Sequence, residues 1–386
     1  MSVRGTVGCR RALAVVLVVL LAACGGSGEA DDAAVASRTE APATTPLPGG
    51  QPLAPPCAPA PLETRAATVL MVGIGNVTTP TDPLAVEVAA LGLGGVVLVK
   101  PNVVEATQVR ALVEGLRRQS PRPLLVSVDE EGGRVSRLRP VIGPTPSARE
   151  LGRRPLAEIT AVAAERGATL RELGFDLILA PVADVDGGPA GGAIGDRSFA
   201  ATPAEAGARA GAFAEGLARA GVAATAKHFP GQGELADSHD RAVVADVPLG
   251  ELEATAAATF GPVIAGDVPA VMMSHVTFPA LGPLPASLEA GAYRLLRSLG
   301  FEGVAVTDAI NMSAVAGQRS LSEAGVMALA AGADLVLATP GDQAAAMRDA
   351  VVAAVAGGRL PEARLDEAVG RVLALRGENA STMVCR

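Results

Sequence analysis

From residue 66 onward, short runs of apolar and β-branched residues alternate with longer stretches in which apolar residues recur at helical spacing. The short runs are apolar throughout, a pattern typical of parallel strands that are covered on both faces. Eight runs are predicted to be strands: 67–73, 94–100, 123–129, 175–181, 222–228, 270–275, 303–308 and 333–339. Predicted helices between and after them include 105–119, 155–174, 204–221 and 361–377.

The alternation predicts eight βα units and therefore a single (β/α)8 barrel of the TIM type, with extended loops at the carboxyl ends of its strands. An open doubly wound sheet, as in a two-lobed solute-binding lipoprotein, is the alternative that this pattern leaves open. Barrels of this class carry their catalytic side chains at the carboxyl ends of the strands. Polar residues end or follow the predicted strands here: Asp129, Asp184, Asp186, Lys227, His228, His275 and Asp308. We expect a functional site at this end of the barrel.

The first residues have the organisation of an export signal. Arginines precede an apolar run over 12–23, which at about a dozen residues is shorter than the roughly 20 that a membrane-spanning helix needs. The sequence LAAC at 21–24 resembles the bacterial lipobox, which implies that Cys24 is lipidated and becomes the mature N-terminus. A soluble secreted protein cut near Ala23 is the alternative. We expect an extracytoplasmic protein that a lipid anchor holds at the cell membrane.

Three parts are therefore expected along the chain. A signal peptide with its lipobox covers 1–23, a lipidated cysteine and a Pro-rich tether without any apolar period cover 24–65, and the catalytic domain covers 66–386. Cys57 in the tether and Cys385 near the C-terminus remain as unassigned cysteines of the mature chain. Because the exterior is oxidising and a barrel brings its first and last units together, we predict a disulfide between them.

Composition and charge narrow the choice of partners. The 386 residues, 49% of them hydrophobic, suffice for a sizeable buried core. A formal net charge of −8 gives no long-range attraction to nucleic acid, which is not an expected partner. The sequence contains no GxxxxGKS/T loop, no CxxC pair and no HExxH. We expect no metal and no cofactor, and we expect a monomer.

The stretch 226–240, AKHFPGQGELADSHD, holds two of the three histidines and one of the two lysines of the chain. Its core, KHFPGQGELADSH at 227–239, resembles the β-N-acetylhexosaminidases of glycoside hydrolase family 3. Four further segments carry the same resemblance: DEEGGRVSRL (129–138), IGDRSF (194–199), VMMSHVTFPALGPLPASL (271–288) and FEGVAVTDAINMSAV (301–315). The resemblance covers roughly 66–377 and implies a barrel enzyme with a retaining mechanism.

The resemblance also implies three catalytic residues. Asp308 matches the nucleophile, which attacks the anomeric carbon and forms a glycosyl-enzyme. Asp237 and His239 match an acid/base pair in which the carboxylate orients the imidazole and favours its protonated form. A protonated imidazole in that place can donate a proton to the departing sugar oxygen.

Other matched positions are implied to bind the sugar. Asp129, Arg137, Arg197, Lys227 and His228 match residues that hydrogen-bond substrate hydroxyls in the family. For Glu131, Asp196 and His275 the choice between contact with the sugar and support of other residues stays open. Gln232 departs from the family, whose common pattern is KHFPGHG. The departure puts the subsite preference at the rim of the site in doubt.

The implied function is that of a retaining exo-β-N-acetylglucosaminidase. Its substrates would be β-linked GlcNAc glycans, namely peptidoglycan fragments, muropeptides or chito-oligosaccharides, and its role would be cell-wall recycling. Two alternatives remain: a sugar-binding lipoprotein without turnover, and a β-glucosidase or β-N-acetylglucosaminide phosphorylase on the same scaffold.

Overall fold

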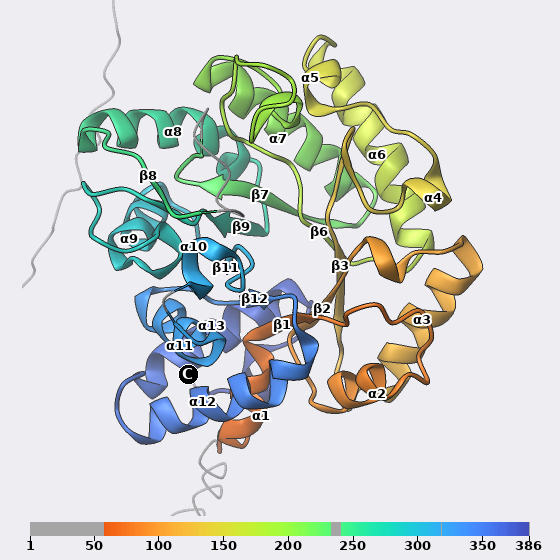
Figure 1. Cartoon of the computed structure of the whole chain (residues 1–386), viewed down its shortest axis with the longest axis vertical. Helices are drawn as coiled ribbons and strands as arrows, with labels where there is room; N and C mark the ends of the chain where they lie inside the picture. Colours follow the sequence, from red (N-terminus) through yellow and green to blue (C-terminus); the bar gives the residue numbers. More distant parts are fainter. Residues whose placement is uncertain (1–57, 233–240, 318, 386) are drawn as a thin grey trace, which may run out of the picture. The chain divides into compact units, whose positions relative to one another are not determined.

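The computed structural model describes residues 58–232, 241–317 and 319–385. Its centre is a barrel of eight parallel strands (Figure 1). The strands are β1 (Leu70–Gly73), β2 (Gly95–Leu98), β3 (Leu125–Val128), β6 (Leu177–Ile178), β7 (Ala223–Phe229), β9 (Ala270–Met273), β11 (Val304–Thr307) and β12 (Val336–Ala338). Each overlaps one of the eight predicted runs.

The barrel strands follow one another around the sheet in the order of the sequence. All their pairings are parallel, and β12 pairs with β1. A parallel bridge between Val306 and Leu335 joins β11 to the residue before β12. The sheet therefore closes, which confirms the (β/α)8 barrel and rules out the open doubly wound sheet.

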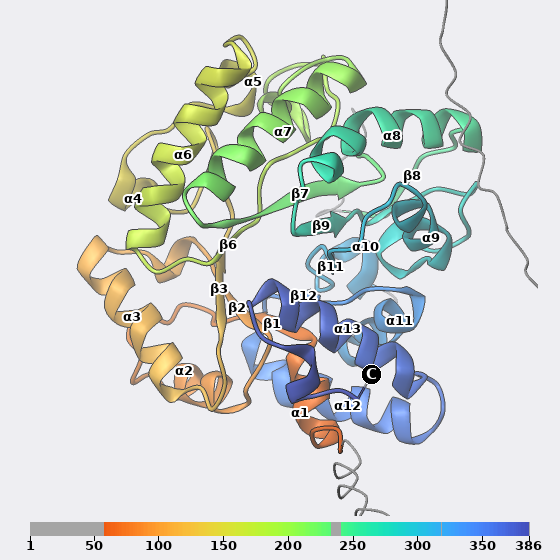
Figure 2. The same cartoon turned by 180° about the vertical axis from the view of Figure 1, so that it is seen from behind.

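Helices form an outer ring around the strands (Figures 1 and 2). They are α2 (Pro83–Ala90), α3 (Ala106–Gln119), α6 (Leu156–Glu172), α7 (Pro203–Arg219), α8 (Leu249–Ala265), α9 (Ala290–Ser298), α11 (Leu321–Ala331), α12 (Ala344–Ala356) and α13 (Glu362–Leu375). In α3 the buried residues Val109, Leu112, Val113 and Leu116 recur at helical spacing. This stripe buries itself on the barrel, as the amphipathic pattern predicts.

The strands are apolar throughout because the barrel has a core on each side of its sheet. Met71 belongs to an inner cluster that also holds Leu177 and Leu337, whereas its neighbours Leu70 and Val72 belong to the outer core beneath the helices. Successive side chains of a strand point to opposite faces. Both faces of the sheet are therefore shielded from water, so its strands need no alternation of polar and apolar residues.

The remaining short elements lie mostly in the loops that follow the strands, as expected for extended loops at the carboxyl ends. These are α4 (Arg139–Ile142), α5 (Ala148–Leu151), α10 (Ser313–Ala316), β4 (Glu130–Gly132), β5 (Val135–Ser136), β8 (Val243–Val244), β10 (Val276–Thr277), η1 (Lys100–Asn102), η2 (Gly195–Arg197), η3 (Ala286–Leu288) and η4 (Gly341–Gln343). Two others flank the barrel: α1 (Leu62–Thr68) and η5 (Ala380–Thr382).

The folded domain begins earlier than the expected residue 66. Helix α1 starts at Leu62, and the side chain of Arg65 is 4% exposed and pairs with Glu362 and Asp366 of α13 at 2.6 and 2.5 Å. The first and last units lie side by side in both views (Figures 1 and 2). The apolar pattern missed this helix because a paired arginine forms part of its buried face.

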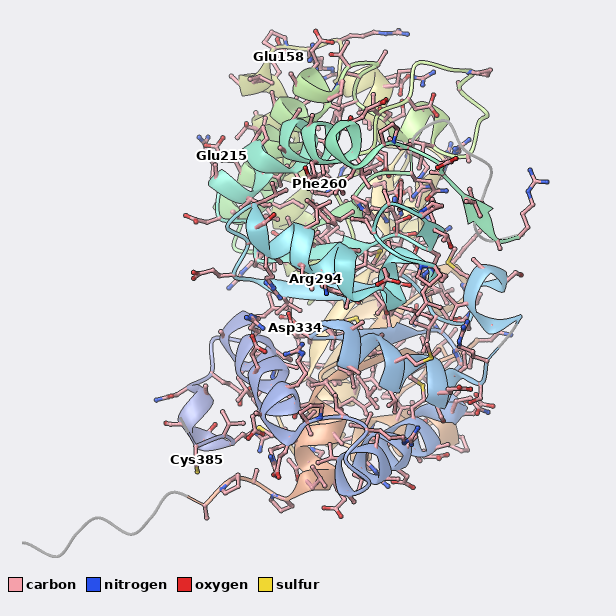
Figure 3. The ribbon with its side chains drawn as sticks, turned by 90° about the vertical axis from the view of Figure 1, so that its left-hand side faces the viewer. Glu158, Glu215, Phe260, Arg294, Asp334 and Cys385 are labelled. Atoms are coloured by element: carbon pink, nitrogen blue, oxygen red, sulfur yellow. The ribbon has the colours of Figure 1, made fainter. Side chains whose placement is uncertain are left out.

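Two expectations about the ends of the chain fall largely outside the described residues. Cys385, labelled in Figure 3, is disulfide-bonded. Cys57 and Cys24 lie outside the described residues, so the pairing of Cys57 with Cys385 and the lipidation of Cys24 stay predictions. Within the described part of the chain, no helix has the length and apolarity that crossing a membrane requires.

Candidate active site

The carboxyl ends of the strands bring five predicted sugar-binding residues into one cluster. Asp129 directly follows β3, and Arg137 follows the hairpin of β4 and β5. Lys227 and His228 lie on β7, and Arg197 ends the short helix η2 after β6. We call these five residues the cradle. Polar contacts link all five residues, directly or through Glu131.

Lys227 is the central cation of the cradle. Its Nζ lies 2.6 Å from Oδ1 of Asp129 and 2.6 Å from Oε1 of Glu131. Nη2 of Arg137 donates to the other oxygen of Asp129 at 2.9 Å. Burial lowers the pKa of Lys227, but the two carboxylates outweigh it and raise the pKa above its ordinary value. The lysine is therefore charged and held in place as a donor.

Glu131 holds two cations of the cradle in position. The guanidinium of Arg197 donates to both its oxygens, at 2.7 and 2.8 Å, in a two-pronged pair. The Glu131 side chain is only 3% exposed. Burial would raise its pKa, yet Arg197 and Lys227 hold the pKa well below its ordinary value. These contacts favour a supporting role for Glu131, which the sequence had left open: it holds Arg197 and Lys227 in position.

Replacing Glu131 with glutamine should destabilise the protein by about 3–5 kcal/mol near neutral pH, because two buried cations lose their shared carboxylate. Since folding lowers the pKa of Glu131, its stabilisation is present above the ordinary pKa of 4.5 and is lost as pH falls below it. The difference in the free energy of unfolding between wild type and Glu131→Gln should therefore be smaller in acid. Urea unfolding of both proteins at about pH 7 and about pH 3.5 measures this difference.

The matched control is Glu215→Gln. Glu215 pairs with Arg219 on the outside of α7 and is 55% exposed (Figure 3). A surface pair of this kind contributes about 0–1 kcal/mol. A loss in Glu131→Gln no larger than in this control, or a loss independent of pH, would contradict the assignment.

His228 is oriented by a buried carboxylate. Its Nδ1 lies 2.6 Å from Oδ2 of Asp184, and Gln232 N–H donates to Oδ1 of the same carboxylate at 2.6 Å. Because a carboxylate accepts, we place the imidazole proton on Nδ1. Nε2 is then the acceptor, 3.5 Å from Nη2 of Arg197. Gln232 makes this contact through its backbone N–H. Replacement of the histidine that is common at this position therefore leaves the contact intact.

Asp308 follows β11 and is held as an anion. Its Oδ1 accepts the N–H of Ala309 at 2.7 Å. Burial raises the pKa of Asp308, but His275 and His228 in their protonated forms, the Ala309 N–H and the charge of Lys227 together lower it below its ordinary value. An ionised carboxylate at the end of a barrel strand suits a nucleophile.

His275 supports the segment that carries Asp308. Its Nε2 lies 3.0 Å from the carbonyl oxygen of Ala309, and its Nδ1 lies 2.7 Å from Oγ of Ser287. A carbonyl only accepts, so we assign the proton to Nε2 and let the Ser287 hydroxyl donate to Nδ1. These contacts favour the supporting role that sequence reasoning had left open.

Two arginines that the sequence did not single out fix the loop that carries Arg197. Arg134 donates to carbonyl oxygens of that loop, and Arg149 holds a second set. The acceptors of Arg134 are Ala190, Gly192, Ala193 and Ile194, and those of Arg149 are Asp186, Gly188 and Gly195. Asp196 pairs with Arg134 at 3.2 Å and so belongs to this support. In the sequence, the only signals for this support are Arg134 directly after Gly133 and the glycine-rich loop itself.

The predicted acid/base residues Asp237 and His239 lie outside the described residues. Across 58–232, 241–317 and 319–385, no group of three or more His, Cys, Asp or Glu residues is arranged to hold a metal ion.

Comparison with known proteins identifies the family. The Glycosyl hydrolase family 3 N terminal domain matches residues 62–375. The chain belongs to glycosyl hydrolase family 3. This family 3 chain is 40% identical over 280 residues to Beta-hexosaminidase LpqI of Mycobacterium tuberculosis (strain ATCC 25618 / H37Rv). The matched region covers 70% of this chain and 72% of that protein.

Solved structures of family 3 proteins have the same fold. A glycosyl hydrolase from Mycobacterium smegmatis matches with a TM-score of 0.76 and 37% identity, over 82% of this chain and 97% of that one. A β-N-acetylglucosaminidase from Paenibacillus sp. str. FPU-7 matches with a TM-score of 0.77 and 33% identity, over 84% of this chain and 64% of that one. The family 3 resemblance is confirmed, and the chain is a glycoside hydrolase.

Proposed function

We propose that this enzyme is a retaining exo-β-N-acetylglucosaminidase that releases terminal, non-reducing GlcNAc. The observation that carries the proposal is the ionised Asp308 at the same end of the barrel as the cradle, close enough for the charge of Lys227 to lower its pKa. Relatives named β-hexosaminidase and β-N-acetylglucosaminidase support the choice of sugar.

In the first step the Asp308 carboxylate attacks the anomeric carbon while the glycosidic oxygen departs with a proton from His239. Asp237 orients the imidazole and favours its protonated form. In the second step neutral His239 takes a proton from water, which displaces Asp308 and releases GlcNAc with retained configuration. No metal or cofactor takes part in this sequence.

The cradle supplies the matching donors and acceptors for the sugar. Asp129 can accept from ring hydroxyls, whereas Arg137, Lys227 and Arg197 can donate to them. Nε2 of His228 is placed as an acceptor by the proton on Nδ1. Each cation already has a carboxylate partner, so the groups are preorganised before the sugar arrives.

Short fragments are the proposed substrates: peptidoglycan fragments, muropeptides or chito-oligosaccharides, with a role in cell-wall recycling. Long glycan chains usually need aromatic side chains on which sugar rings can stack. The chain has no tryptophan, and its single tyrosine, Tyr293, is buried with its hydroxyl donated to the carbonyl of Ser287 at 2.7 Å. Tyr293 is therefore not available as a stacking surface.

Hydrolysis of aryl β-GlcNAc and aryl β-glucoside substrates, each with and without inorganic phosphate, tests the proposed activity. We expect turnover of the β-GlcNAc substrate to GlcNAc in both buffers. GlcNAc-1-phosphate as the main product would make the enzyme a phosphorylase, and faster cleavage of the glucoside would make it a β-glucosidase. Binding of GlcNAc without turnover would leave a sugar-binding lipoprotein.

We also propose that Cys24 anchors the mature protein to the cell membrane from outside the cytoplasm. The supporting observation is the LAAC sequence at the end of a short apolar run. Cys24→Ala should release or misprocess the protein, which membrane fractionation and immunoblotting of the two forms would show. Equal membrane association of wild type and variant would contradict the anchor.

A further inference from the structure

Arg137 is the cation of the cradle whose side chain has the fewest contacts. Lys227 lies between two carboxylates, and Arg197 forms a two-pronged pair with Glu131. Within the described part of the chain, the guanidinium of Arg137 makes one hydrogen bond, from Nη2 to Asp129 at 2.9 Å, and its side chain is 34% exposed. Its position therefore depends more than theirs on what holds its backbone.

The backbone next to Arg137 is held by the side chain of Glu130. Oε2 of Glu130 accepts the N–H of Leu138 at 3.0 Å, and both residues are fully buried. The carbonyl oxygen of Leu138 accepts the N–H groups of Val141 and Ile142 in α4, at 2.8 and 2.9 Å. Leu138 is therefore fixed on both sides of its peptide backbone, and Arg137 directly precedes it.

The same contact closes the base of the hairpin that carries an ion pair of the cradle. Asp129 directly precedes Glu130, and Arg137 directly precedes Leu138. Glu130 also faces Ser136 in the antiparallel pairing of β4 with β5. The Glu130 contact thus joins the two chain segments from which Asp129 and Arg137 reach each other.

The tip of this hairpin has anchors of its own. Gly132 and Gly133 take φ angles of +95° and +56°, which favour glycine, and the Gly133 N–H donates to the carbonyl oxygen of Thr145 at 3.0 Å. A Cβ on Gly132 would collide with the carbonyl oxygen of Pro146. Loss of the Glu130 contact should therefore loosen the base of the hairpin and leave its tip and the barrel folded.

Glu130 is a costly residue for a contact that serves stability alone. Burial and the charge of Asp129 raise its pKa, and the Leu138 N–H, Ser136 and the charge of Arg166 offset this only in part. The folded protein thus disfavours the ionised carboxylate. Stability gives little reason for a carboxyl group here, whereas an acceptor of this length is what holds the N–H of Leu138.

We infer that Glu130 is a positioning residue for sugar binding, whose side-chain oxygen holds the backbone of Leu138 so that the Arg137 guanidinium stays against Asp129 and presents its remaining N–H groups to a sugar hydroxyl. Glu130 is buried and does not touch the sugar. It sets the affinity of the cradle and leaves the chemistry at Asp308 unchanged. The inference rests on the proposed function, since it takes GlcNAc as the sugar.

Three variants separate the acceptor of Glu130 from its charge. Glu130→Gln keeps an acceptor oxygen at the same reach, Glu130→Asp keeps the charge but is one methylene shorter, and Glu130→Met has neither feature. With an aryl β-GlcNAc substrate, KM should stay within about twofold of wild type in Glu130→Gln and rise about tenfold in the other two. The kcat should stay within about threefold in all three, because the lost binding is shared by ground state and transition state.

A cycle of variants tests whether Glu130 acts through Arg137. In an Arg137→Met background, adding Glu130→Met should change KM by less than about twofold, because the guanidinium that Glu130 positions is already gone. Titration calorimetry with GlcNAc measures the affinity of the same proteins without turnover, and Kd should follow KM. A wild type that binds GlcNAc without turnover would contradict the proposed activity, and the Kd values would still test Glu130.

Asp176→Leu controls for destabilisation at the opposite end of the barrel. Asp176 directly precedes β6, accepts the N–H of Val126 at 2.9 Å and has a side chain that is 39% exposed. Its loss should lower the Tm but leave KM and Kd within about twofold of wild type. A merely structural role predicts the same behaviour for Glu130→Met, with a lower Tm and an unchanged KM.

An unchanged KM and Kd in Glu130→Met would therefore overturn the inference. Three other results would do the same: a Glu130→Asp protein closer to wild type than Glu130→Gln, a full tenfold effect of Glu130→Met in the Arg137→Met background, or a wild type that does not bind GlcNAc. If Glu130→Met does not fold, Glu130→Asp replaces it in the cycle with the same expectations.

Discussion

Asp308→Ala should reduce hydrolysis of every β-GlcNAc substrate by about 10⁴-fold or more, whatever the leaving group. The variant lacks the group that forms the bond to the anomeric carbon, so a better leaving group cannot restore the first step. Steady-state kcat/KM for an activated aryl β-GlcNAc and for a GlcNAc disaccharide measures the effect. Both values should fall together.

Asp349→Ala is the matched control, because Asp349 is an exposed carboxylate on α12 that pairs with Arg348. Its kcat/KM should stay within about twofold of wild type, as expected for a surface position. If Asp308→Ala retained more than a tenth of the activity, or lost it only on the disaccharide, another residue would have to be the nucleophile.

His239→Ala should fail in a different way. Without proton transfer, cleavage of a sugar leaving group should slow by about 10²–10⁴-fold. An activated phenol departs as a stable anion, so its release in the first step should survive. Because no base remains to activate water, the second step should stall and a burst of phenol should precede slow turnover. Stopped-flow absorbance of the released phenol measures the burst.

Asp237→Ala should show a milder form of the same defect, since the imidazole persists without its orienting partner. External azide should speed turnover of the trapped His239→Ala enzyme, because this nucleophile needs no base. Equal slowing of activated and unactivated substrates in His239→Ala would contradict the role of His239 as acid and base.

The barrel could be predicted from the sequence because its strands are dry on both faces. Apolar runs such as 94–100 and 303–308 fit parallel strands covered on both faces, and eight of them in alternation with helical stretches predict the barrel. The domain boundary could not be predicted as well. Helix α1 buries Arg65 through ion pairs with α13, and an arginine in the sequence normally indicates an exposed face.

The members of the site could be predicted, but their network could not. Strand ends and family motifs identified Asp129, Lys227 and Asp308. The double pairing of Glu131 with Arg197 and Lys227, and the contact of Asp184 with His228, join residues far apart in the chain. No local pattern encodes such contacts, because they depend on how neighbouring strand ends meet in the closed barrel.

Gln232 shows the same limit of local sequence patterns, since the sequence alone predicts an altered preference at the rim of the site. From the sequence, a histidine replaced by glutamine loses a titratable group. In the structure the backbone N–H of Gln232 bonds Asp184 and thereby helps to orient His228. A backbone contact does not depend on the side chain, so the departure is compatible with an intact cradle.

The central claim is that Asp308 forms a covalent bond with the sugar while His239 governs its release. Mass spectrometry of the His239→Ala enzyme, quenched during turnover of an activated aryl β-GlcNAc and digested with protease, tests it most directly. The account predicts one added N-acetylhexosamine on the peptide that contains Asp308, absent from the His239→Ala, Asp308→Ala double variant. A label on any other peptide, or no label despite a phenol burst, would contradict it.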